Sequence, residues 1–358
     1  MRLKRILLTA QAFLLILGIA CTVVSCRDIL PQNSEATKSD TAMQTHGVTE
    51  ESQTEKDTDN GQTESGNDGV YEGERYHILI TSDMHYTELT TYYNTDRDTR
   101  LQYWVDGILA EHARDPYDLI IILGDVSLDY WGWNGGGSYQ RKPSVSDTRL
   151  FMERYASQLP EDVPMLVLPG NHELYTNEKW KELTGNERNE SFVLGDNLFV
   201  IPDSYSGAVD PKYQGSGKND SPYKAVDMEF IRGEIDKHPE CNNIYLISHH
   251  FDLSQESEEF KTLLKTERRI VGLFSGHTHS YKAKKLGQTY NNLYQLQTGN
   301  FADYGDENVE NFSWGFRDLI IEGERVTSTY VIPNCQYTVD GVKYSVERKH
   351  ADITLLRY

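Results

Sequence analysis

The sequence predicts an α/β fold, because short apolar runs alternate with stretches of helical spacing between residues 76 and 275. The apolar runs are rich in β-branched residues and end at turn residues, which is typical of buried strands. Five runs lead into short polar clusters; they cover residues 76–81, 118–123, 163–168, 243–247 and 270–274. Open α/β sheets bind ligands at the carboxyl ends of their strands. The clusters therefore mark a candidate site.

Three stretches between these strands have the spacing of helices; they cover residues 96–115, 146–159 and 222–237. In the first, Leu101, Trp104 and Ile108 would share one helix face. After His279 the pattern changes to strands without intervening helices, at residues 293–296, 317–321 and 326–332. A further strand pair, residues 337–344 and 353–358, is predicted around the hairpin dipeptide Asp340-Gly341.

The amino-terminal segment, residues 1–26, has the basic start and apolar stretch of a secretory signal peptide. It ends at Val23-Val24-Ser25-Cys26, which resembles the lipobox of bacterial lipoproteins. This resemblance implies a lipid anchor at Cys26, attachment to the cell membrane and an extracytoplasmic location. Cys21 is a weaker candidate, because Gly18 replaces the usual branched residue. An uncleaved anchor helix is the alternative, since the stretch is about long enough to span a bilayer.

Residues 27–70 are predicted to form a disordered, acidic tether rich in Ser and Thr, because they contain few large aliphatic side chains. Residues 71–358 are long enough for one well-buried domain.

The formal net charge of −20 argues against a long nucleic-acid footprint. A small phosphorylated substrate remains compatible, because bound dications reverse the local field. Cys241 and Cys335 could pair outside the cell, although cysteines this far apart are more often unpaired.

Each of the five polar clusters contributes Asp, Asn or His, the side chains that bind divalent metals. The clusters are Asp83-Met84-His85, Gly124-Asp125, Gly170-Asn171-His172-Glu173, His249-His250 and Gly276-His277-Thr278-His279. Six of the eleven histidines fall inside them, so coincidence is a poor explanation. We therefore expect one metal site assembled from the whole chain.

The spacing within two clusters suggests how they bind. Asp83 and His85 are two residues apart, as are His277 and His279. On a strand this spacing puts both side chains on one face, so each pair could chelate one metal from two points. The carboxylate of Asp125 has two oxygens and could bridge two cations.

The order of the clusters resembles the calcineurin-like metallophosphoesterases over about residues 76–285. The resemblance implies a four-layer α/β fold, in which a β-sandwich of two mixed sheets is flanked by helices. It also implies a dinuclear centre that hydrolyses phosphomonoesters or phosphodiesters. Two cations that share a water lower its pKa, which makes hydroxide available to attack phosphorus. Imidazole and oxygen ligands suit Mn, Zn or Fe(II).

Carried over residue by residue, the resemblance assigns two sets of metal ligands. The first set is Asp83, His85, Asp125 and His279, and the second is Asp125, Asn171, His249 and His277. Adjacent strand residues face opposite ways, so only one of His249 and His250 should reach the metals. His172 is expected to act as the general acid or as a transition-state donor. Glu173 either orients His172 or caps the following helix.

The sequence therefore predicts a membrane-anchored metallophosphoesterase, a hydrolase that acts on a phosphate ester with two divalent metal ions. The alternative is a non-catalytic protein of the same fold that binds or adheres at the cell surface. The complete ligand set favours the enzyme, because a site that no longer binds metal needs no such side chains. A glycine-rich loop with Trp131 and Trp133 could contact the substrate or pack on the core.

Overall fold

The computed structural model describes residues 74–88, 91–92, 95–129, 146–207, 220–302, 314–333, 335–339, 342–346 and 349–355. All of them belong to the compact unit Asp68–Tyr358. The predicted signal peptide, the predicted tether and the loop with Trp131 and Trp133 lie outside these ranges. No helix within the described ranges is both long and apolar enough to cross a membrane.

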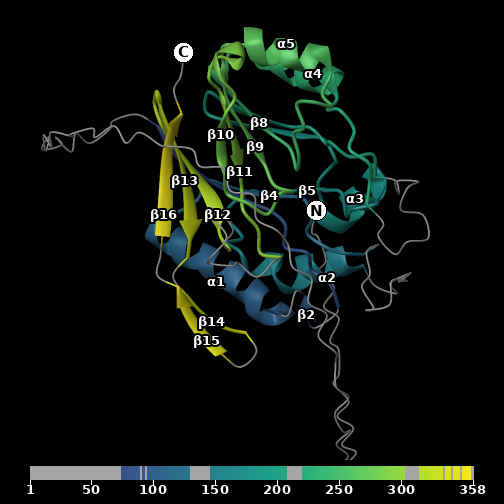
Figure 1. The fold of residues 1–358 in the computed structure, drawn as a ribbon, viewed down its shortest axis with the longest axis vertical. Coiled ribbons are helices and arrows are strands. Elements are labelled where there is room, and N and C mark those ends of the chain that lie inside the picture. Colours follow the sequence, from purple (N-terminus) through teal and green to yellow (C-terminus); the bar gives the residue numbers. More distant parts are fainter. Residues whose placement is uncertain are drawn as a thin grey trace, which may run out of the picture. The chain divides into compact units, whose positions relative to one another are not determined.

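Two six-stranded sheets of mixed strand direction form the centre of the domain (Figure 1). The first runs in the order β16 (Lys349–Leu355), β13 (Arg325–Ile332), β12 (Phe316–Glu322), β1 (Arg75–Thr81), β4 (Leu119–Leu123) and β5 (Met165–Leu168). The second runs in the order β10 (Ala283–Lys285), β11 (Tyr294–Gln297), β9 (Ile270–Ser275), β8 (Asn243–Ile247), β7 (Asn197–Ile201) and β6 (Glu190–Leu194). Strands β1, β4 and β5 are parallel, as are β7, β8, β9 and β11.

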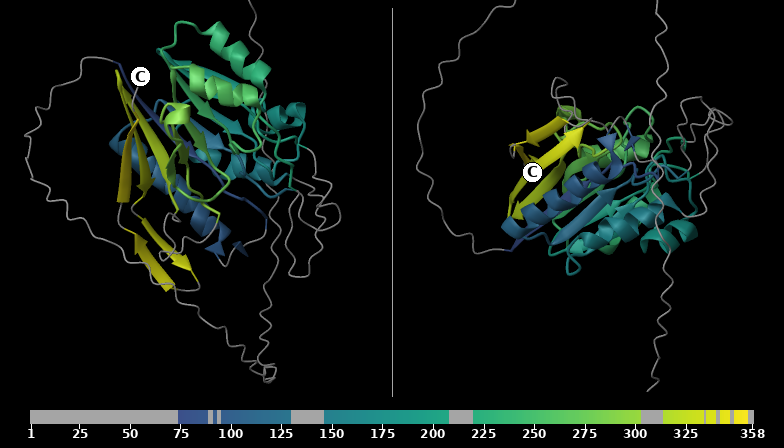
Figure 2. Two further views of the ribbon diagram at one scale, coloured as in Figure 1. Left: turned by 45° about the horizontal axis from the view of Figure 1, so that its top comes forward. Right: turned by 90° about the horizontal axis from the view of Figure 1, so that it is seen from below.

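Helices cover the outer faces of both sheets, so the domain has four layers (Figures 1 and 2). The first sheet packs on α1 (Arg97–Arg114), α2 (Asp147–Arg154) and α3 (Asn177–Thr184). The second packs on α4 (Met228–Lys237) and α5 (Glu258–Thr266). A third apolar core lies between the sheets. This arrangement confirms the predicted α/β fold with two mixed sheets flanked by helices.

Strand β4 shows why the apolar runs are continuous. Leu119, Ile121 and Leu123 belong to the core between the sheets. Ile120 and Ile122, which alternate with them, belong to the core beneath α1 and α2. Because both faces of the strand are covered, every position is apolar and none is exposed.

Several expected elements differ from the structure. The helix expected over residues 146–159 ends at Arg154 and is followed by a 3₁₀ turn, η1 (Ala156–Gln158). The helix expected from residue 222 begins only at Met228, because the Asp227 side chain caps it. Strand β14 (Cys335–Val339) pairs with β15 (Val342–Val346), so the hairpin exists, but the last segment instead joins β13 as β16. Cys241 is buried and its thiol is free, which agrees with the preference for unpaired cysteines.

The sequence analysis did not predict α3, α5, β6, β7, β10 or the short pair β2 (Thr91–Tyr92) and β3 (Thr95–Asp96). Strand β6 is only partly buried along its whole length, so it lacks the alternating pattern that identifies a strand. Strand β10 is fully exposed and short, which leaves little apolar signal.

Candidate metal centre

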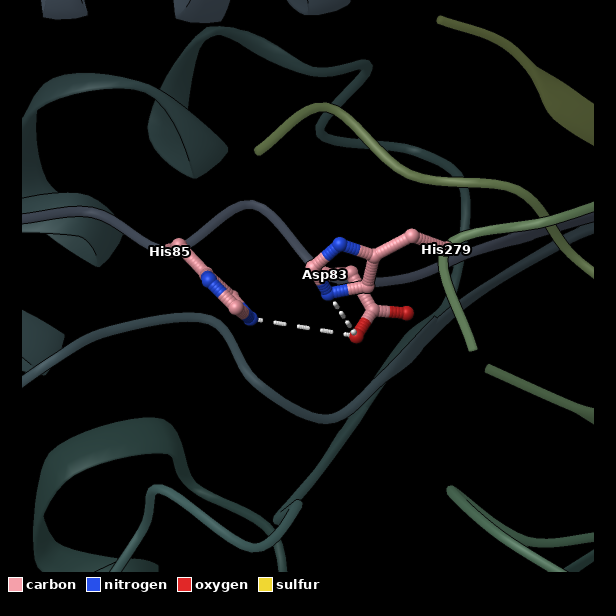
Figure 3. Close-up of side chains that lie close together, drawn as sticks. All are labelled: Asp83, His85 and His279. Atoms are coloured by element: carbon pink, nitrogen blue, oxygen red, sulfur yellow. Dashed lines mark ion pairs between the residues drawn. The ribbon is translucent and has the colours of Figure 1, made fainter. Parts of the chain in front are cut away.

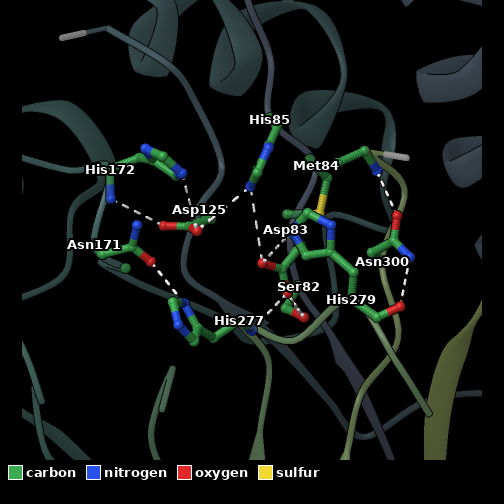
Figure 4. Close-up of polar contacts among 12 residues, drawn as sticks. Ser82, Asp83, Met84, His85, Asp125, Asn171, His172, His277, His279 and Asn300 are labelled. Carbon is green, nitrogen blue, oxygen red and sulfur yellow. Dashed lines mark hydrogen bonds and ion pairs between the residues drawn. The ribbon is translucent and has the colours of Figure 1, made fainter. Parts of the chain in front are cut away.

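The five polar clusters directly follow β1, β4, β5, β8 and β9. These strands run parallel within their sheets, so their carboxyl ends share one edge of the sandwich. Side chains from four of the clusters point toward one another in Figure 4. The fifth cluster reaches them through His249, which contacts Asn171 and Asp125.

A first group consists of Asp83, His85 and His279 (Figure 3). Oδ1 of Asp83 lies 3.4 Å from Nε2 of His279 and 3.8 Å from Nε2 of His85. The carboxylate is fully buried, and Oδ1 accepts no hydrogen bond from any described residue. Oδ2 accepts from Ser82 Oγ (2.6 Å) and from the His277 amide (2.9 Å). A buried carboxylate oxygen without a donor is costly, so a cation fits between it and the two imidazoles.

A second group consists of Asn171, His249 and His277. Oδ1 of Asn171 lies 3.2 Å from Nε2 of His249 and 2.8 Å from Nδ1 of His277. Nδ1 of His249 donates to the Leu123 carbonyl at 2.7 Å, because a carbonyl oxygen can only accept. The neutral ring therefore keeps its lone pair on Nε2, the nitrogen that faces the group.

Asp125 lies between the two groups. Its Oδ2 is 3.4 Å from Nε2 of His85 and 3.2 Å from Nε2 of His249. Its Oδ1 accepts a hydrogen bond from the amide of His172 at 3.0 Å. One carboxylate oxygen thus faces both groups, which is the placement that a bridging ligand requires.

Burial and neighbouring charges shift the pKa values of these side chains in different directions. Burial would raise the pKa of Asp125, but His249 and His172 outweigh it and hold that pKa well below its usual range. Burial lowers the pKa of His85 to about 4 and that of His277 to about 3, which leaves neutral rings that can ligate a metal. Burial also opposes the charge on His249, but Asp125 raises its pKa to about 9. Cation binding there would release a proton.

The backbone of the clusters is strained. Among the described residues, seven other than glycine have φ in the left-handed region, and five of these belong to the clusters. They are Asp83 (57°), His85 (46°), Asp125 (50°), His277 (68°) and His279 (57°). Such conformations cost free energy and concentrate at functional sites. The strain is thus independent support for a functional centre.

The Asp83/His85 and His277/His279 pairs do not lie on strands. Strand β1 ends at Thr81 and β9 ends at Ser275, so both pairs lie in loops beyond their strands. His277 contacts Asn171, whereas His279 contacts Asp83. The expectation that His277 and His279 chelate one metal together is therefore wrong.

Two glycines let the neighbouring loops approach closely. Gly124 has φ of 77°, and a Cβ there would lie 2.6 Å from Nδ1 of His249. A Cβ on Gly170 would collide with Oδ1 of Asp125 and lie 2.6 Å from its amide nitrogen. A side chain at Gly124 would displace His249, and a side chain at Gly170 would displace Asp125.

His172 adjoins Asp125 and His85 without belonging to the two sets of expected ligands. Its Nε2 lies 3.7 Å from Oδ2 of Asp125, and its Nδ1 lies 3.0 Å from Oδ1 of Asp220. Burial would lower the pKa of His172, but Asp125 and Asp220 raise it above its usual value. Asp220 could not be predicted as a partner of His172, because nothing in its local sequence connects the two residues.

Glu173 plays neither of its expected roles. Its Oε2 accepts from the amides of Asp125 (2.9 Å) and Gly170 (2.6 Å), and its Oε1 accepts from the amide of Ser127 (3.0 Å). The following helix, α3, is capped by Thr176 instead. Glu173 thus holds together the loops after β4 and β5, and its burial raises its pKa to about 7.

His250 contacts His277 rather than Asp125 or Asn171. Its ring stacks on His277 with centroids 4.3 Å apart, and its Nδ1 lies 3.1 Å from the Tyr205 hydroxyl. The structure therefore brings His249, rather than His250, to Asp125 and Asn171.

Comparisons with known proteins define the class to which this fold and site belong. Residues 76–281 match the family described as calcineurin-like phosphoesterase. The chain is a member of that family. None of the curated proteins matches the sequence.

Solved structures share the fold. A dimetal phosphatase from Danio rerio is 11% identical, with a TM-score of 0.53 over 79% of this chain and 99% of that chain. PhoD is 11% identical, with a TM-score of 0.48 over 79% of this chain and 70% of that chain. GAP50 from Plasmodium is 11% identical, with a TM-score of 0.39 over 77% of this chain and 89% of that chain. Of these three, only the Danio rerio structure has a TM-score above 0.5, and at 11% identity it shows the fold alone.

Proposed function

We propose that the protein is a metal-dependent phosphoesterase that hydrolyses a phosphomonoester or a phosphodiester at a dinuclear centre. One observation carries this proposal. Oδ2 of Asp125 faces two groups of side chains, each of which could hold a cation. Membership in the calcineurin-like phosphoesterase family supports the reaction class.

The proposed ligands divide as the two groups do. Asp83, His85 and His279 would hold one cation, Asn171, His249 and His277 would hold the other, and Asp125 would contact both. Bound Mn, Zn or Fe(II) would neutralise charge on the phosphoryl oxygens and lower the pKa of a water molecule. The chain contributes preorganised lone pairs, which the Leu123 carbonyl and the strained loops orient.

His172 is the proposed proton donor to the leaving oxygen. The contact between Asp220 and Nδ1 favours a proton on that nitrogen and restrains the ring. The proton on Nε2, the nitrogen that faces Asp125, is then the one available to an ester oxygen. Asp220 acts through His172, so it is a positioning residue.

The test is hydrolysis of p-nitrophenyl phosphate and bis(p-nitrophenyl) phosphate by the purified protein. Metal is first removed with a chelator, and Mn²⁺, Zn²⁺ or Fe²⁺ is then restored. We expect hydrolysis of at least one ester only after metal is restored, with two metals per chain by elemental analysis. If two metals bind but neither ester is hydrolysed, the proposed phosphoesterase activity is refuted. That result would favour a role in binding at the cell surface.

We also propose that residues 1–26 direct export, that Cys26 carries a lipid anchor, and that residues 27–70 tether the domain of residues 71–358 outside the cytoplasm. The basic start, the apolar stretch and the lipobox-like end of that segment support this. In cells fed a labelled fatty acid, Cys26→Ser should lose the label, and the matched Cys21→Ser variant should keep it. The reverse result would move the anchor to Cys21, and label on neither wild type nor variants would exclude lipidation.

A further inference from the structure

The hydroxyl of Tyr205 reaches the candidate centre from the segment after β7. The side chain is buried, and its hydroxyl lies 3.4 Å from Nδ1 of His277 and 3.1 Å from Nδ1 of His250. Asn171 contacts the same His277 nitrogen. The Tyr205 ring also packs near His249, with centroids 5.7 Å apart. A phenol hydroxyl therefore borders the group proposed to hold the second cation.

The backbone of Tyr205 is held from both sides. Its amide donates to Oδ1 of Asp203 at 2.9 Å, and its carbonyl accepts from Nη2 of Arg188 at 3.4 Å. Arg188 and Asp203 form an ion pair of 2.7 Å that is itself buried. Tyr205 also forms an antiparallel bridge with Tyr223. The hydroxyl is thus positioned before any ligand arrives, which is what an effective donor needs.

His250 determines where the hydroxyl proton can go. A hydroxyl can accept one hydrogen bond and donate another, and a neutral imidazole has one N–H and one lone pair. When Nδ1–H of His250 donates to the phenol oxygen, the Tyr205 proton remains for a second acceptor. The Nδ1 lone pair of His277 is not that acceptor once it ligates a cation. A phosphate-ester oxygen in the site has the required lone pairs.

We propose that the Tyr205 hydroxyl donates a hydrogen bond to a phosphoryl oxygen of the substrate, beside His249 and His277. This inference rests on the proposed function and adds a substrate-contacting residue that none of the five polar clusters contains. His172 adjoins His85 instead, with ring centroids 4.9 Å apart. Tyr205 carries no charge, so it adds a donor without binding a proton or a metal. Such a donor stabilises the charge that develops on phosphoryl oxygens in the transition state.

The experiment compares Tyr205→Phe with Tyr223→Phe as the matched control. The Tyr223 hydroxyl donates to Glu256 and accepts from the amide of Asp252, so it points elsewhere. Metal content, orthophosphate binding by calorimetry to the Mn²⁺-loaded protein, and kcat and KM are measured for both variants. Tyr205→Phe should keep both metals, lose about 100-fold in kcat and bind orthophosphate about 10-fold more weakly. Tyr223→Phe should change neither phosphate binding nor kcat.

Two results would overturn the inference. One is unchanged orthophosphate affinity in Tyr205→Phe. The other is loss of a metal with activity restored by excess Mn²⁺, because the hydroxyl would then serve the cation site. A wild-type protein that binds metal and hydrolyses neither ester would refute the proposed function separately. The orthophosphate comparison would still decide whether Tyr205 contacts phosphate.

Discussion

Arg100 is a buried arginine of α1 whose guanidinium contacts the loop that carries Asp83 and His85. Nη2 donates to the His85 carbonyl at 2.7 Å. Nη1 donates to the carbonyls of Met84 and, at 2.8 Å, Phe301. The helix thus holds the strained loop by two hydrogen bonds, and a third from the same charged group holds the carbonyl of Phe301. We predict that Arg100→Met weakens both the fold and metal binding.

The expected magnitude follows from these contacts. A hydrogen bond from a charged group contributes about 1.5–3 kcal/mol, and a buried carbonyl left unpaired adds a penalty of about 1–3 kcal/mol. The left-handed conformations of Asp83 and His85 each store about 1–3 kcal/mol that the contacts must offset. Such terms are not additive, so we expect the free energy of unfolding to fall by about 3–5 kcal/mol. Release of the loop should lower Mn²⁺ affinity at least about 10-fold, the equivalent of about 1.4 kcal/mol.

The assays are urea unfolding and Mn²⁺ titration. Arg100→Lys serves as a second variant if Arg100→Met does not fold, because one ammonium group cannot reach all three carbonyls. The matched control is Arg149→Met in α2, where Arg149 pairs with Glu182 at 2.9 Å and both side chains are about half exposed. That surface pair should contribute at most about 1 kcal/mol. Wild-type Mn²⁺ affinity in both Arg100 variants would refute the reasoning.

Three further predictions concern the candidate centre. Asp125→Asn should remove activity more completely than the loss of any other ligand, with metal content falling in parallel by elemental analysis. Two retained metals and a near-normal rate would contradict the bridging role. His249→Ala should weaken Mn²⁺ binding more than the matched His250→Ala, and the opposite order would mean that His250 is the ligand. His172→Ala should keep both metals and lose about 10²–10⁴-fold in rate on alkyl phosphate esters. The loss should be smaller on nitrophenyl esters, whose leaving group needs no proton. An equal loss on both would assign His172 to positioning, and loss of a metal would make it a ligand.

Much of the fold could be predicted because its signal is local. Strand β4 is a continuous apolar run that is buried on both faces, and the apolar stretches within β1 and β8 are buried as well. Helix α1 was predicted within one residue at each end, since Asp96 caps its first turn and Asp115 ends it. Elements with weaker burial, such as β6 and β10, carry no comparable pattern. Pairing is non-local as well, so β16 was assigned to the wrong partner.

The candidate centre, like the fold, could be predicted only in part. The sequence indicated its polar clusters, and the structure brings Asp83, Asp125, Asn171, His249 and His277 together. The reason offered for two of the pairs was wrong, because the residues adopt left-handed conformations in loops instead of alternating along strands. Left-handed conformation is rare outside glycine, and only the surrounding contacts hold it here.

The sequence by itself determined which residues are apolar enough to form buried strands and which polar side chains follow them. The apolar pattern and the turn residues are features of neighbouring positions in the chain, so they can be recognised without the fold. Only the tertiary structure decided that Asp220 contacts His172, that Glu173 joins two loops, and that Arg100 and Tyr205 reach the centre. These contacts join residues far apart in the sequence or depend on how loops pack, and the order and twist of the sheets bring them within hydrogen-bond distance.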